Sequence, residues 1–239
     1  MRHIFCLKTL SVAIATFSVA SVASAAGLDR SGQDITAFLQ DGLYAEAVYT
    51  YIDADVTGND NAYVGTDNNA YTQGREIGDI AESYDFFRYG VKADINDTFS
   101  IGVLYDEPFG AAADYSGDNK FVDQNPASPR NGEGTNVEVR TESLTGILGA
   151  KFGSNKEFQV YGGPVAQRVK AEVKLRGTAY EAANGYTTNI SSDQDYGYIA
   201  GLAYSKPEIA LKAALTYRSE IEHTTNAAEN YPTVAAIPG

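Results

Sequence analysis

The sequence predicts an all-β protein, a transmembrane antiparallel β-barrel of which about seven strands are present. Three observations predict it. Residues alternate between apolar and polar along several runs, each run reaches the roughly 9–11 residues of a tilted membrane strand, and the links between runs are alternately short and long. Short turns on one side and long loops on the other are typical of outer-membrane barrels. The alternative, a soluble sandwich with uneven loops, usually has strands of only about 5–6 residues.

Residues 1–25 have the three parts of a secretory signal peptide: a basic start, an apolar run over 9–22 and small residues at 23–25. The alternative is a membrane anchor, but the apolar run is shorter than the roughly 20 residues that a spanning helix needs. The single cysteine, Cys6, lies inside this segment. The exported chain is therefore expected to contain no disulfide, which suits a bacterial envelope protein.

The chain is strongly acidic. Its formal net charge of −13 becomes −15 once Arg2 and Lys8 leave with the signal peptide. This charge makes nucleic acid and anionic membrane surfaces poor partners. Acidic residues gather in 53–60 and 114–123, which we interpret as solvated loops. The stretch 53–60 loosely resembles a calcium loop but is not followed by a glutamate at the spacing that such a loop needs, so no metal and no cofactor is expected.

No stretch after residue 26 is apolar for long enough to form a helix in lipid. Any contact with a membrane must then be made by strands closed into a barrel, because lipid leaves unpaired strand edges unsatisfied. Residues 26–42 differ from the rest. Ile35, Phe38 and Leu39 are helically spaced there and Ser31 can cap a turn, which predicts a small irregular or helical segment before the partial barrel of 43–239.

The seven predicted strands follow in order. They occupy 42–52, 84–96, 99–111, 137–152, 157–176, 194–205 and 208–222. In 165–176 the row containing Val165, Val169 and Val173 is predicted to face lipid, and the charged row containing Arg168 and Lys174 to face a wet lumen. Bacterial barrels normally have even strand numbers, and the last residues are polar and interrupted by proline. We therefore expect the N-terminal part of a longer barrel.

Several segments together resemble the FadL family, the long-chain fatty acid transporters of the bacterial outer membrane. They are "AGLDRSGQDITAFLQDGLYAE", "IGVLYDEPFGA", "GGPVAQRVKAEVKL" and "PEIALKAALTYRSEIEH". The likeness extends over residues 26–223, about the first half of a typical member. It depends on the order and spacing of several segments and not on one short pattern.

This resemblance implies a fourteen-stranded barrel whose lumen is blocked by an N-terminal hatch, here residues 26–42. It implies that hydrophobic compounds, fatty acids or aromatic hydrocarbons, bind inside the plugged barrel and leave sideways where the third strand is kinked. The hatch lacks the Asn-Pro-Ala motif of many members, and the "NPA" at 125–127 falls in a predicted external loop. The expected partners are hydrophobic small molecules and outer-membrane lipid, and the protein is expected to be a monomer of the bacterial outer membrane.

The third strand contains the predicted lateral opening. Its residues are Asp106, Glu107, Pro108, Phe109 and Gly110. Pro108 has no N–H for the ladder, and Gly110 weakens a strand. A bulge or inward kink at this point would open a gap beside the neighbouring strand. The alternative is that Pro108 only marks the exit into loop 110–136; the resemblance favours the kink.

A bound ligand would gain affinity from apolar burial, about 25 cal/mol per Å², with a cation for any carboxylate head. Cations predicted to point inward are Arg88, Lys92, Arg168, Lys170, Lys174 and Arg218. For most of them we favour the alternative, an internal ladder of salt bridges with Asp94, Glu172, Glu208 and Glu220. Phe38 and Leu39 of the hatch are expected to line the pocket or to plug the lumen.

Other functions are less well supported by the residues. After signal removal His223 is the sole histidine, and no G-x-S-x-G motif is present, so we do not predict an enzyme. A porin-like or structural barrel remains the alternative to a transporter. Such a barrel would conduct small polar solutes, whereas a plugged transporter would bind apolar tails and conduct few ions.

Overall fold

The computed structural model describes residues 32–59 and 76–231. The predicted signal peptide, 1–25, lies outside the described residues, and so do residues 26–31 of the predicted hatch. In the part that is described, strands dominate, and no helix is long and apolar enough to cross a membrane.

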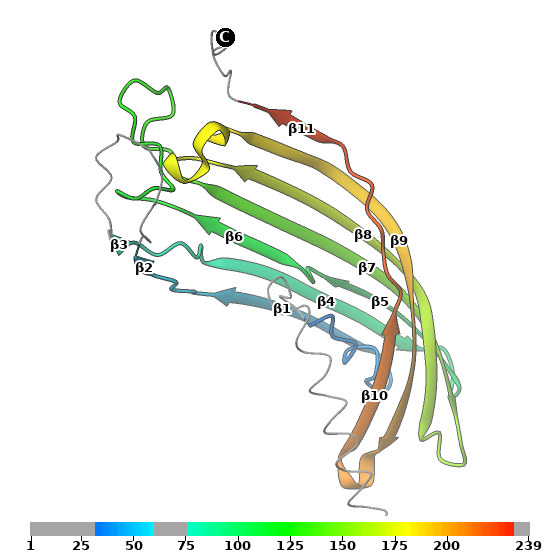
Figure 1. The fold of residues 1–239 in the computed structure, drawn as a ribbon. Helices are drawn as coiled ribbons and strands as arrows, with labels where there is room; N and C mark the ends of the chain where they lie inside the picture. Colours follow the sequence, from blue (N-terminus) through cyan, green and yellow to red (C-terminus); the bar gives the residue numbers. More distant parts are fainter. Residues whose placement is uncertain (1–31, 60–75, 232–239) are drawn as a thin grey trace, which may run out of the picture.

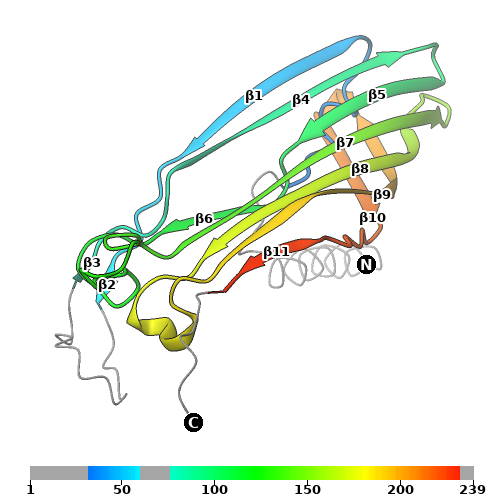
Figure 2. The same ribbon diagram turned by 90° about the horizontal axis from the view of Figure 1, so that it is seen from above.

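The main sheet is antiparallel throughout and follows the order β1-β4-β5-β7-β8-β9-β10. Its strands are β1 (Tyr44–Ile52), β4 (Tyr84–Asp94), β5 (Phe99–Asp106), β7 (Asn136–Phe152), β8 (Phe158–Lys174), β9 (Thr187–Lys206) and β10 (Leu211–Arg218). β6 (Gly110–Asp114) adds to β7, and β11 (Ala227–Asn230) adds to β9. The sheet curls into a half-barrel with a convex and a concave face (Figures 1 and 2). The predicted all-β class and the seven strand positions are confirmed.

Short elements complete the fold. They are the small ladder of β2 (Gly58–Asn59) with β3 (Glu76–Ile77), and the 3-10 turns η1 (Thr178–Ala183) and η2 (Pro207–Ile209). At one end of the sheet the turns are short. In the β4–β5 turn the Asn96 side chain accepts hydrogen bonds from the backbone N–H groups of Thr98 and Phe99, both at 2.8 Å. The opposite end carries the long loops.

β9 is longer than predicted. It begins at Thr187, so the last seven residues of the predicted loop 177–193 are strand. Because β7, β8 and β9 hold 17, 17 and 20 residues, at about 3.3 Å per residue they extend well beyond an apolar band about 25 Å tall. In the upper half of β8 the alternation continues, but its convex row is charged and not apolar.

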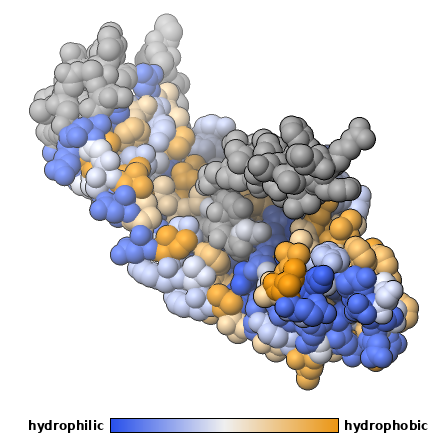
Figure 3. All heavy atoms as spheres, turned by 90° about the horizontal axis from the view of Figure 1, so that it is seen from below, coloured by the Kyte–Doolittle hydropathy of each residue, from blue (hydrophilic) through white to orange (hydrophobic). Residues whose placement is uncertain are grey.

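Large apolar side chains cover much of the convex face. Phe87, Tyr89 and Val91 of β4 are about half exposed, while Phe86, Gly90 and Lys92 on the alternate positions are buried. The same period of two continues through the sheet. Exposed members include Tyr49, Tyr51, Phe99, Ile101, Val103, Leu144, Leu148, Val160, Tyr196, Tyr198, Leu202, Leu215 and Tyr217. Figure 3 shows hydrophilic residues gathered at the two ends of the face turned to the viewer, with hydrophobic residues between and beside them.

The orientation predicted for β8 is wrong. Val165 is 3 % exposed and packs in the concave core, so its row faces inward. Arg168 and Lys170 belong to the same row as Phe158 and Val160, on the convex face, and are exposed. The charged row begins where the apolar convex row ends, near Ala166. Beyond the apolar convex row an outward charge is exposed to solvent, so nothing forces it to the concave side.

Candidate functional site

The N-terminal segment occupies the concave face of the half-barrel. Residues 33–42 form consecutive turns and not the helix that the spacing allows; for example, the Phe38 N–H donates to the Ile35 carbonyl at 3.0 Å. Asp34 organises the first turn by accepting hydrogen bonds from the backbone N–H of Thr36, at 2.7 Å, and from its hydroxyl. We call residues 33–42 the hatch segment.

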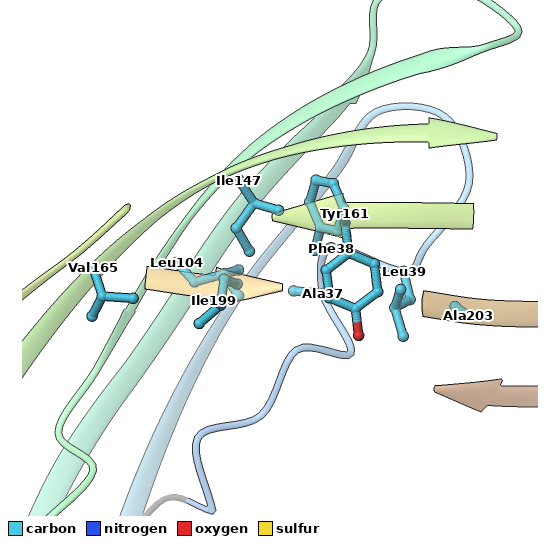
Figure 4. Packing of buried hydrophobic residues seen from close by; sticks show 9 residues of the cluster. All are labelled: Ala37, Phe38, Leu39, Leu104, Ile147, Tyr161, Val165, Ile199 and Ala203. Atoms are coloured by element: carbon cyan, nitrogen blue, oxygen red, sulfur yellow. The ribbon is translucent and has the colours of Figure 1, made fainter. Parts of the chain in front are cut away.

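The tip of the hatch segment is the centre of the hydrophobic core. Phe38 is completely buried, and Ala37 and Leu39 are nearly so. The core side chains that surround this tip come from β5, β7, β8 and β9 (Figure 4): Leu104, Ile147, Tyr161, Val165, Ile199 and Ala203. Because the hatch and the sheet form this core together, the concave face is filled at this level.

Glycines in the wall make room for the hatch. A Cβ added at Gly102 would lie 2.7 Å from the Phe38 ring, and one added at Gly149 would lie 2.9 Å from it. Both distances are shorter than any real contact of this kind. Gly102 and Gly149 alternate with exposed apolar residues on β5 and β7, so they face the concave side. The missing side chains form the seat for the aromatic ring.

Cations from the strands hold the hatch backbone and its carboxylates. Lys92 is fully buried and donates to the Gly42 carbonyl at 3.2 Å and to Asp94 at 2.6 Å. Arg88 pairs with Asp34 at 2.8 Å. Further anchors join Lys151 to Asp41 at 2.9 Å, Lys212 to the Leu39 carbonyl at 2.6 Å and Arg218 to the Gln33 carbonyl at 3.1 Å. Of the six cations predicted to point inward, Arg88, Lys92 and Arg218 thus contact the hatch.

The pKa values of the hatch carboxyls reflect these anchors. Burial acts to raise the pKa of Asp34, but the hydrogen bonds from Thr36 and the charge of Arg88 outweigh it and hold the pKa below its usual range. For Asp41, the hydrogen bond from Lys151 lowers the pKa against the opposing effect of burial. Both groups therefore favour the anchored, ionised form at neutral pH.

The third strand is broken at the predicted position. Asp106 pairs with Ser143, and Gly110 pairs with Arg140, so residues 107–109 lie opposite only two residues of β7. This is a one-residue bulge centred on Pro108. Thr141 holds it to β7: its hydroxyl donates to the Phe109 carbonyl at 2.7 Å, and its backbone N–H donates to the same carbonyl at 3.1 Å.

On its other side the third strand leaves β4. The ladder between β4 and β5 stops at Tyr89 and Tyr105, and pairing resumes only at the single bridge between Ala81 and Ala113. The pairs Tyr89–Tyr105 and Ala81–Ala113 keep the same register. The third strand therefore leaves β4 after Tyr105 and returns to the same alignment at Ala113. Over residues 82–88 and 106–112, all within the described chain, no backbone pair joins the two segments. The wall is interrupted there.

A cavity of about 230 Å³ lies beside this bulge, between the hatch and the sheet. Its lining combines apolar side chains with the guanidinium of Arg218. The residues are Gln33, Phe109, Ser143, Val165, Gln167, Tyr198, Arg218, Ser219, Glu220 and Ile221. Asp106, 5 % exposed, interacts electrostatically with Arg218. Arg218 therefore contacts the hatch residue Gln33, lines the cavity and interacts with Asp106 at the bulge.

The structure brings together part of the predicted site. Asp106, Pro108 and Gly110 are buried and Glu107 and Phe109 are half-buried, all at the bulge, and Phe109 alone of the five lines the cavity. Phe38 and Leu39 lie in the neighbouring core and do not line this cavity. Arg168 and Lys170 are on the opposite face. Sequence reasoning missed Lys151 and Lys212 as hatch anchors, because their partners lie 110 and 173 residues away.

Comparison with known proteins adds little to this geometry. No protein-family model and no curated protein matches the chain. Among solved structures the chain is similar to one described as "Crystal structure of a Pseudomonas aeruginosa FadL homologue", with 18 % identity and a TM-score of 0.41. The match covers 69 % of this chain and 39 % of the other. The curved antiparallel sheet, the hatch contacts and the bulge are established by the geometry above and do not depend on this likeness.

Proposed function

We propose that the chain belongs to an outer-membrane transporter of hydrophobic compounds, with its convex face in lipid and its concave face closed by the hatch. One observation carries the proposal. The wall is interrupted at the Pro108 bulge at the level of an internal cavity, and a gap of this kind lets an apolar molecule pass between lumen and lipid without crossing the polar outer region.

The cavity lining favours an amphipathic substrate. Phe109, Val165 and Ile221 offer apolar surface, worth about 25 cal/mol per Å² buried. Arg218 supplies a guanidinium suited to a carboxylate head. We therefore propose long-chain fatty acids as the substrate class and Arg218 as the head-group ligand. Release is sideways, through the gap beside residues 106–110.

The experiment compares two ligands and two variants. Arg218→Gln is expected to weaken binding of a long-chain fatty acid by about tenfold to a hundredfold, since a hydrogen bond to a charged group contributes about 1.5–3 kcal/mol, and to leave binding of an alkane of equal length unchanged. Pro108→Val restores a ladder donor at the bulge and is expected to reduce uptake without affecting folding. Equal losses for both ligands in Arg218→Gln, or normal uptake by Pro108→Val, would contradict the proposal.

The second candidate, a porin-like or structural barrel, makes a different prediction. In that case the hatch would be incidental, and the protein would conduct ions at a level that deletion of residues 33–42 does not change. A plugged transporter is expected to conduct little and to gain conductance when the segment is removed. The buried Phe38 and its anchors favour the plugged state.

A further inference from the structure

A charged patch covers the convex face of β7 and β8 directly above the apolar belt. Below it, Leu144 and Leu148 of β7 and Val160 of β8 are exposed on the same face. Above Leu144 and Ala166, every convex position of the two strands up to Glu138 and Lys174 is charged. The patch consists of Glu138, Arg140, Glu142, Arg168, Lys170, Glu172 and Lys174.

The centre of the patch opposes two like charges. Arg140 and Lys170 are direct cross-strand partners, an arrangement that destabilises a sheet. A carboxylate of the patch compensates Arg140, but none of the patch compensates Lys170. Glu138 bonds Arg140 at 2.5 Å, while Glu142 and Glu172 pair with Arg168 and Lys174. Among the described residues, no carboxylate lies within ion-pair distance of the exposed Lys170.

The other flank of Lys170 presents hydroxyl groups. Val169 pairs with Asp193 and Ala171 with Ile190, so Ser191 and Ser192 of a β9 bulge both lie opposite Lys170. Both serines are exposed. Two cations on one rung, next to a bulge with two hydroxyl donors, form a surface suited to an anion with several oxygens.

The net charge of the whole chain disfavours anionic surfaces, but the patch itself holds four cations against three carboxylates. From this geometry we infer that Arg140 and Lys170 bind the phosphate of an anionic lipid in the outer leaflet. The inference rests on the proposed function, because it requires the apolar belt to lie in a bilayer. A headgroup phosphate would then stand at the level of the patch. Its negative charge would neutralise the Arg140–Lys170 rung and offset the repulsion.

The test measures lipid selectivity of the full chain in phosphatidylcholine bilayers by electron paramagnetic resonance. Spin-labelled phosphatidic acid is compared with spin-labelled phosphatidylcholine, and the signal is the motionally restricted fraction at the protein surface. The preference for phosphatidic acid is expected to fall about fivefold for each cation removed in R140Q and K170Q. The control is R130Q, a cation of the long loop before β7, which is expected to keep the full preference.

A second measurement separates binding from folding. In uncharged detergent K170Q is expected to raise the thermal midpoint, because it removes the repulsion with Arg140; in bilayers with phosphatidic acid it is expected to lower the midpoint. A preference for phosphatidic acid that persists in the R140Q/K170Q double variant would overturn the lipid site and leave the proposed function standing. If neither labelled lipid were restricted by any variant, the chain would not be in the bilayer, and both the site and the proposed function would fail.

Discussion

Replacing Phe38 by alanine tests whether the hatch is held mainly by one buried ring. Phe38 is completely buried among Ile147, Tyr161 and the glycine seats, with the Tyr161 ring centroid 5.8 Å away. Truncating such a ring typically costs about 3–5 kcal/mol. Since about 1.4 kcal/mol is a factor of ten, the population with an undocked hatch should rise roughly a hundredfold to a few thousandfold.

Two assays follow the hatch directly. Amide hydrogen exchange of residues 33–42 reports the undocked population, and ion conductance in a planar bilayer reports whether the lumen opens. Both are expected to increase in Phe38→Ala. The matched control is Leu43→Ala, because Leu43 adjoins the hatch but is 82 % exposed. Exchange and conductance that stay at the level of the unmodified chain would refute the argument that this ring plugs the lumen.

Two further predictions concern the same seat. Gly102→Val is expected to undock the hatch as Phe38→Ala does, because the new Cβ would lie 2.7 Å from the Phe38 ring. The control Ala93→Val, at a half-buried convex position, is expected to leave the hydrogen exchange of residues 33–42 unchanged. Equal exchange in the two variants would contradict the close fit. The lowered pKa values of Asp34 and Asp41 mean that their contribution is complete above the unfolded-state pKa of about 3.9 and is lost as pH falls through the lower folded-state values. Hatch protection in hydrogen exchange should therefore be constant from pH 7 to about pH 5 and fall below about pH 4; a loss already between pH 7 and 6 would show that other groups control it.

Strand positions could be predicted because alternation of period two is a local signal. The run "FSIGVLYD" shows it in eight consecutive residues, and β5 occupies those residues. Pro108 and Gly110 likewise marked the bulge, because the chemistry of proline in a ladder is local. The sequence alone left open whether the strand ended there or continued. Its continuation depends on the hydrogen bond between Phe109 and Thr141, which are 32 residues apart.

The anchors and one strand orientation required information that is not local. Lys212 and Leu39 are 173 residues apart, so no spacing rule could pair them. Between Val165 and Leu175 apolar and charged positions alternate along the chain, and this alternation does not say which of the two rows faces outward. Arg176 ends the same charged row in the sequence, yet it is 4 % exposed and bonds Glu133 at 2.8 Å, joining two long loops.

The most direct test of the account measures which solvent each face of the sheet meets. With the single Cys6 replaced by serine, one cysteine at a time is placed along β7 at 144, 145, 147 and 148 and spin-labelled in bilayers. Labels at 144 and 148 are expected to be relaxed by oxygen dissolved in lipid, and labels at 145 and 147 to be shielded from both oxygen and a water-soluble nickel complex by the hatch. Strong relaxation by the nickel complex at 144 and 148 would place the convex face in water and contradict the account.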